Sequence, residues 1–137
     1  MLLDIIIVSD FRFPGGTSAA VAHEIRALSG AGYSIGLVQK RALLLKKDRD
    51  INPQIAACLK AGEALLLRDK ELDGVIERRL AILHNPLAFT TLGSDLPALR
   101  ARHAILVADQ PAIDAKGEPY YDVWAVQQTA AHLVGEV

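Results

Sequence analysis

The fold is decided by residues 5–37, which read IIIVSDFRFPGGTSAAVAHEIRALSGAGYSIGL. The apolar run at residues 5–8 predicts a buried strand, and residues 33–39 predict a second one. Between them, apolar and small residues recur at the spacing i, i+3, i+4, i+7, which predicts an amphipathic helix packed on a sheet. The residues of this stripe are Ser18, Val21, Ala22, Ile25, Leu28 and Ser29. The stretch therefore predicts a parallel strand–helix–strand unit.

The predicted helix leaves polar residues outside its stripe and ends at glycine. His23, Glu24 and Arg26 fall outside the stripe. Gly30 and Gly32 stand where the helix must stop, and glycine readily takes the left-handed backbone conformation that a C-cap needs. The second strand is therefore expected to begin directly after these glycines.

The loop between the first strand and the helix is the first candidate site. Pro14 stiffens its approach, while Gly15 and Gly16 remove side chains where the backbone turns. A hydroxyl of Thr17 or Ser18 is expected to cap the helix. Free N–H groups at the positive end of a helix dipole suit an anion such as a phosphate. A tight turn that binds nothing is about equally consistent with a glycine pair.

The rest of the chain reads as further strands and helices of the same unit type. Strands are expected at residues 64–67, 80–84 and 104–108, the first two as buried interior strands. Asn52 and Pro53 predict one helix start, and Asp122 predicts another. Residues 40–50 are expected to form a surface connection with a basic rim. The sequence predicts an α/β fold with a Rossmann-like, doubly wound parallel sheet, three layers and strand order 3-2-1-4-5.

The finer helical patterns predict where each helix packs. Residues 86–92 are expected to form a short helix, and residues 95–102 another turn or two. The stripe of the helix after Pro53 is expected to contain Ile55, Ala56 and Leu59, and that of the last helix Val123, Val126, Ala130, Leu133 and Val134. Such stripes predict helices packed against a sheet.

Polar residues follow two later strands at the points where those strands end. His84 and Asn85 end the fourth strand, and Gln110 follows the fifth. Ligands of open α/β sheets bind outside the carboxyl ends of the strands, which is the edge that also carries the glycine loop. A lone histidine at a strand end is more often structural, but this position favours a role in binding. Asp10, Arg12, Asn85 and Gln110 are additional cleft candidates.

Composition indicates one soluble domain without a strong electrostatic partner. The chain has 137 residues, 51% of them hydrophobic and 23% charged, with a formal net charge of −1. This charge gives no reason to expect nucleic acid as a partner. Cys58 is the only cysteine, so an intrachain disulfide is impossible, and it is expected to pack rather than react. The sequence has neither a signal peptide pattern nor an apolar run of about 20 residues, which predicts a cytoplasmic protein, with peripheral membrane contact left open.

Three motifs in order carry a family resemblance. They are DFRFPGGTSAAVAHEIRALSGAGYSIGLV, then ILHNPLAF, then LVADQPAID with PYYD. Together they resemble the amino-terminal domain of a GT-B glycosyltransferase of the retaining, sucrose-synthase-like class. The resemblance implies that the Pro-Gly-Gly loop contacts the donor diphosphate or the acceptor, and that a strand-end histidine lies beside the donor sugar. Gly15, Gly16 and His84 match those motif positions.

The resemblance also implies a partner domain that these residues do not include. A complete GT-B enzyme has a second Rossmann-like domain, whose acidic motif binds the nucleotide of the sugar donor. The 137 residues are therefore expected to be the acceptor-side half of a nucleotide-sugar-dependent transferase of polysaccharide biosynthesis, inactive alone. No metal or other cofactor is expected, because cationic side chains and helix ends stabilise the leaving group in this family.

Other nucleotide-binding classes lack their required motifs here. A nicotinamide dehydrogenase needs Gly-x-Gly-x-x-Gly and an acid after the second strand, where this chain has Gln39, Lys40 and Arg41. A phosphate-binding loop needs Gly-Lys-Ser/Thr, which is absent. A phosphoacceptor receiver needs paired acids after the first strand, but Asp10 stands alone. The serious alternative is a non-catalytic flavodoxin-like module that binds a small ligand or signals.

Overall fold

The computed structural model describes residues 2–13, 16–40, 50–68, 77–84, 86–89, 101–108 and 113–134. The described strands are β1 (Leu2–Ser9), β2 (Ile35–Gln39), β3 (Leu65–Leu66), β4 (Glu77–His84) and β5 (His103–Val107). The described helices are α1 (Gly16–Gly30), α2 (Pro53–Lys60), the 3-10 helix η1 (Pro86–Phe89) and α4 (Val123–Val134).

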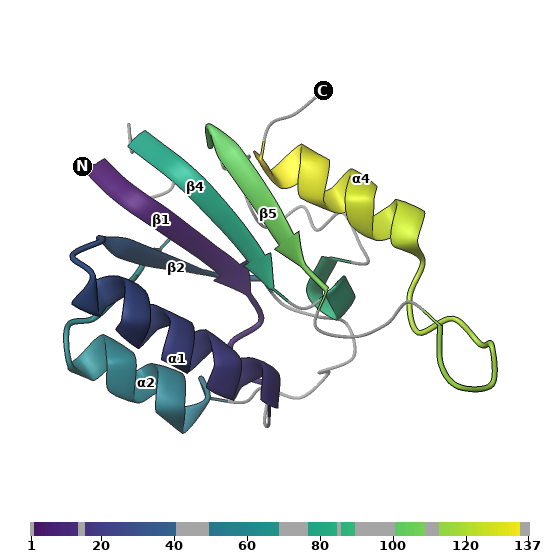
Figure 1. Cartoon of the computed structure of the whole chain (residues 1–137), viewed down its shortest axis with the longest axis horizontal. Helices are drawn as coiled ribbons and strands as arrows, with labels where there is room; N and C mark the ends of the chain where they lie inside the picture. Colours follow the sequence, from purple (N-terminus) through teal and green to yellow (C-terminus); the bar gives the residue numbers. More distant parts are fainter. Residues whose placement is uncertain are drawn as a thin grey trace.

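The described strands form one parallel sheet in the order β3-β2-β1-β4-β5 (Figure 1). Strand β1 lies at its centre, and Ile5 pairs with Ile35 of β2 on one side and with Leu80 of β4 on the other. From β1 the chain proceeds outward to β2 and β3, whereas β4 leads outward to β5 in the opposite direction. The predicted Rossmann-like α/β fold and its strand order are confirmed.

Alternate side chains of the central strand divide the core into two layers. Ile7 of β1 packs with Ile25 of α1 and Ile55 of α2 on one face of the sheet. Ile6 packs on the other face, in a cluster that includes Phe89 of η1 and Val126 of α4. Figure 1 shows the corresponding arrangement, with α1 and α2 on one side of the sheet and α4 on the other. Side chains that alternate along a strand produce this three-layer packing.

Local capping signals confirm several predicted helix ends. Asn52 Oδ1 accepts a hydrogen bond from Gln54 N at 2.9 Å, and Pro53 occupies the first position of α2. Asp122 Oδ1 accepts from the backbone N of Trp124 at 2.9 Å, at the start of α4. Gly32, which follows α1, has a φ of 92°, the left-handed conformation expected there.

Several strand predictions were wrong in burial or extent. Strand β3 was expected to be buried, but among the described strands it pairs only with β2, and Leu65 is 45% exposed. Strand β4 was expected to begin at residue 80, but it begins at Glu77, because this charged stretch pairs with the start of β1. Strand β5 begins one residue earlier than expected, at His103. Parallel pairing thus extends or shifts strands beyond their apolar runs.

The predicted helix faces also needed correction. In α2, Cys58 is buried, whereas Ala56 is exposed. At the start of α4, Val123 is 45% exposed and does not join the buried stripe, which contains Thr129 instead. Lys40 was expected on a basic surface rim, but it is buried, and residues 41–49 lie outside the described ranges.

The remaining helix predictions are tested only in part. Of the short helix expected at residues 86–92, the 3-10 helix Pro86–Phe89 is described. The turn expected at residues 95–102 lies mostly outside the described residues. Among the described helices, none combines the length and the apolar character needed to cross a membrane.

Candidate functional site

The central crevice of the sheet lies where β1 and β4 end side by side. Ser9, the last residue of β1, donates a hydrogen bond from Oγ to the backbone O of His84, the last residue of β4, at 3.1 Å. The chain leaves these two strands in opposite directions, so this is the topological switch point of the sheet. Ligands of open α/β folds bind at such a point, outside the carboxyl ends of the strands. Asp10 and His84 therefore lie at the edge where the sequence predicted a site.

The ring of His84 is held by a carboxylate from α1. His84 Nε2 lies 3.0 Å from Glu24 Oε2, and the His84 side chain is 3% exposed. The Glu24 side chain is 29% exposed, so it reaches from the border of the buried stripe toward the end of β4. The helical periodicity predicted Glu24 on the polar side of the helix. Its position three residues after Val21 places it on the stripe's border, which is the signal that could have identified it.

Asp10 and Arg12 form a buried ion pair within the loop after β1. Asp10 Oδ2 accepts from Arg12 Nη2 at 2.7 Å, and Oδ1 accepts from Arg12 Nε at 2.8 Å. Gln39 Nε2 donates to the same Oδ1 at 2.6 Å, and Gln39 Oε1 accepts from Phe11 N at 2.9 Å. Two parallel charge-assisted bonds fix the orientation of a guanidinium strongly. Both predicted cleft residues thus brace the loop.

The same loop is anchored to the helices on either side. Asn52, the N-cap of α2, donates from its backbone N to Phe11 O at 2.7 Å and from Nδ2 to Phe13 O at 3.2 Å. Ser18 Oγ donates to Phe13 O at 2.5 Å. The expectation that Thr17 or Ser18 caps α1 was wrong, because both lie inside a helix that begins at Gly16. Ser18 instead fastens the helix to the loop.

Gly16 opens α1 with free space where a side chain would stand. It is exposed, and a Cβ built on it would have no heavy atom of the described residues within 4 Å. Its φ is not in the left-handed region, so its backbone does not require glycine. Space beside the first turn of a helix is compatible with the approach of a ligand. The other predicted site residues, Gly15, Asn85 and Gln110, lie outside the described residues.

Comparison with known protein families, with curated proteins and with solved structures finds no match. The resemblance to GT-B glycosyltransferases therefore depends on the three sequence motifs alone.

The cysteine is a packing residue. Cys58 is fully buried, and its Sγ donates a weak hydrogen bond to Ala22 O at 3.7 Å, which joins α2 to α1. Burial raises the pKa of this thiol above its ordinary value; the positive charge of Arg26 opposes the rise, and the negative charge of Glu63 adds to it. A neutral, buried thiol is a poor nucleophile. The described residues contain no cluster of three or more His, Cys, Asp or Glu side chains that would hold a metal ion.

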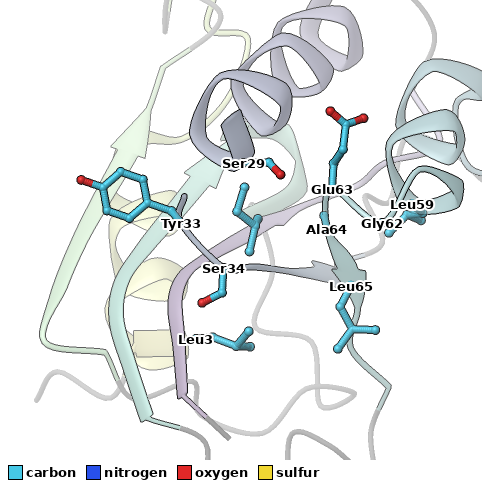
Figure 2. Close-up of a pocket in the computed structure, with 10 residues that line it drawn as sticks. Leu3, Ser29, Tyr33, Ser34, Leu59, Gly62, Glu63, Ala64 and Leu65 are labelled. Carbon is cyan, nitrogen blue, oxygen red and sulfur yellow. The ribbon is translucent and has the colours of Figure 1, made fainter. Parts of the chain in front are cut away.

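A hollow of about 390 Å³ opens at the amino ends of the strands, opposite the switch point. Figure 2 shows it between the ends of α1 and α2 and the starts of β2 and β3, with Tyr33, Ser34, Leu59, Glu63 and Leu65 among its lining. This is the amino-end edge of the strands, far along the sheet from His84. Parallel sheets place their ligands at the carboxyl ends. The candidate site is therefore the switch point, with Glu24 and His84 at its centre.

Proposed function

We propose that the chain is the acceptor-side, amino-terminal domain of a retaining GT-B glycosyltransferase, which moves a sugar from a nucleotide-sugar donor to an acceptor. The order of the three motifs supports this proposal, and so does a Rossmann-like sheet with strand order 3-2-1-4-5. The proposed activity is assigned to one site, at the carboxyl ends of β1 and β4.

The observation that carries the proposal is the place of His84. It ends β4 at the switch point, hydrogen-bonded through its backbone O to Ser9 of β1. Helix α1 begins at Gly16, after the loop that leaves this same β1, so its N-terminus starts from the same edge. A helix N-terminus favours anionic oxygens, such as those of a diphosphate. His84 lies further along the same helix, against Glu24, and an imidazole at this strand end is suited to orient a sugar through hydrogen bonds.

In this proposal the other candidate residues divide into two roles. Gly15, Gly16 and Thr17 border the anionic part of the ligand, and Asn85 and Gln110 border the sugar or the acceptor. Asp10, Arg12 and Ser18 hold the loop in shape, because each is buried and bonded within the loop or to it. Shape matters here, since a preorganised backbone stabilises developing charge without further rearrangement.

The proposed enzyme needs a second domain for the nucleotide and the departing diphosphate. Holding the reacting groups together is worth about 7–11 kcal/mol, and groups that stabilise the leaving diphosphate add to it. Half of a cleft supplies neither contribution fully. We therefore expect these 137 residues alone to transfer no sugar and to bind nucleotide sugars no tighter than about millimolar, equivalent to roughly 4 kcal/mol.

Calorimetric titration with uridine- and guanosine-diphosphate sugars, beside a radiolabelled transfer assay, tests the proposal. For the isolated chain we expect a small heat of binding in the titration and no labelled transfer product. Transfer should appear when a nucleotide-binding domain is supplied, in the same polypeptide or as a separate one. Micromolar binding or turnover by the chain alone would contradict the assignment of an incomplete cleft.

A non-catalytic ligand-binding module on the same sheet is the second candidate. The burial of Asp10 and His84, which are 1% and 2% exposed, favours it, because both side chains already have partners within the chain. Such a module would bind a small ligand tightly without a second domain and would produce no transfer product. The same titration therefore separates the two functions.

A further inference from the structure

We infer that Glu24 is a positioning residue that fixes the ring of His84 at the switch point, with the Nε2 proton directed at its carboxylate. The pair joins α1 to the end of β4 across 60 positions of the sequence, with 3.0 Å between Nε2 and Oε2. Neither motif reasoning nor the helical stripe assigned a role to Glu24. The inference goes beyond the proposed function, because it holds whichever ligand the edge receives.

The chemistry of the two groups decides where the proton lies. An ionised carboxylate only accepts hydrogen bonds, so the ring nitrogen that faces Glu24 must carry hydrogen. In neutral His84 this selects the tautomer protonated at Nε2, and in the imidazolium Nε2 is protonated as well. Only a protonated Glu24 would reverse the direction of the bond. The geometry therefore predicts that Nε2 of His84 carries a hydrogen atom.

Burial makes this contact strong enough to help orient the ring. The His84 side chain is 3% exposed, so water does not compete freely for its Nε2. A hydrogen bond to a charged acceptor is stronger in such surroundings than at the surface. Carboxylates that bond to the far nitrogen of a histidine fix both its tautomer and its rotation in many protein sites. Glu24 has the position and the chemistry for the same task.

The chain supplies its own reference groups for a test by nuclear magnetic resonance. It contains four histidines, and the other three, His23, His103 and His132, are exposed. Their ring protons exchange with water too fast to be seen. With ¹⁵N-labelled histidine, the parent chain should therefore show a protected ring N–H resonance, shifted downfield by the carboxylate and attached to Nε2 of His84. The substitution His84→Gln assigns the signal by removing it.

Substitutions of Glu24 then separate positioning from packing. Glu24→Gln keeps an acceptor oxygen without charge, so the resonance should persist with a smaller downfield shift. Glu24→Leu keeps the bulk without an acceptor, and the exchange rate of the Nε2 proton should rise roughly tenfold or more, because no hydrogen bond must open first. Glu63→Gln is the matched control, since the Glu63 side chain is 26% exposed and the Glu24 side chain 29%. It should leave the His84 signal unchanged.

Three results would overturn the inference. They are a parent spectrum in which the slow proton is on Nδ1, a parent spectrum with no protected ring proton, and a Glu24→Leu signal that matches the parent. The first two need only the parent chain, so the test survives a Leu variant that does not fold. Failure of the sugar-transfer assay would leave all of these spectra as predicted, which keeps this inference distinct from the proposed function.

Discussion

Arg12 Nη2 lies 2.7 Å from Asp10 Oδ2, and the two side chains are 5% and 0% exposed. The residues are two positions apart, so the loop after β1 carries its own buried counter-charge. Charged residues beside a glycine loop suggest contacts with a ligand, but here the two side chains form an ion pair with each other. The ion pair is therefore a determinant of loop shape, and its loss should be visible in stability.

Asp10→Asn should lower the free energy of unfolding by about 3 kcal/mol, because breaking a buried ion pair leaves a charge without its partner. Urea denaturation followed by circular dichroism measures the change. Asp50→Asn makes the same substitution at an exposed position, and it should change stability by less than about 0.5 kcal/mol. Equal effects of the two substitutions would show that the ion pair does not support the loop.

Gly16→Val should leave the stability of the chain within about 1 kcal/mol of the parent, because the site is open and its φ is not left-handed. Activity of a complete two-domain enzyme should fall sharply, since the branched side chain occupies the space that the ligand needs. Gly32→Val is the comparison, because Gly32 has a φ of 92°, and it should lose about 1–3 kcal/mol. A Gly16 variant that is unstable but fully active per folded molecule would make the loop purely structural.

Gly36→Ala should destabilise the sheet by about 1–3 kcal/mol. A Cβ on Gly36 would lie 2.8 Å from Leu67 Cδ1 and 2.9 Å from Leu3 Cδ1, so both leucines must move. Gly30→Ala serves as the control, since no atom in the described part of the chain lies within 4 Å of its Cβ position. Thermal or urea unfolding should give a clearly lower midpoint for Gly36→Ala than for Gly30→Ala. Similar midpoints for both variants would mean that the leucines adjust freely.

Cys58 should make the chain less stable in alkaline solution. Burial raises the pKa of the native thiol above its ordinary value of 9.0, so the unfolded chain releases this proton first. The stabilising contribution is complete below pH 9.0. It is lost as pH rises toward the native pKa, by up to about 1.4 kcal/mol per pH unit.

Urea unfolding of the parent and of Cys58→Ala across this pH range isolates the contribution of Cys58, because all other titrating groups are shared. Disulfide-forming reagents should label the native thiol only as fast as the chain opens. Parallel stability curves for the two proteins, or immediate labelling of the folded parent, would contradict this account of the thiol.

Most of the fold followed from short-range patterns. The apolar run of β1, the Asn52–Pro53 start of α2, the Asp122 cap and the glycine after α1 are all local signals, and each is confirmed. The extra residues of β4 were missed because Glu77 and its neighbours become strand through pairing with β1, which a polar sequence does not indicate. Strand burial likewise depends on neighbours that are distant in sequence.

The candidate site was predictable in place but not in its contacts. His84 was assigned to the correct strand end, because parallel strands end at a common edge. Its partner Glu24 was assigned to the polar face, since periodicity does not show which side chain on a stripe's border reaches another element. Periodicity likewise did not show that the Ser18 hydroxyl donates a hydrogen bond to the carbonyl of Phe13. Hydrogen-bond partners that are distant in sequence become visible only in the three-dimensional structure.

The central place of β1 also sets an order of events during synthesis. Ile5 leaves the ribosome before both of its strand partners, Ile35 and Leu80. The central strand must therefore wait until β4 has been synthesised before both of its edges are covered. Until β4 emerges, an unpaired hydrophobic edge is exposed to other nascent chains. An unpaired strand edge of this kind is a template for pairing with another extended chain.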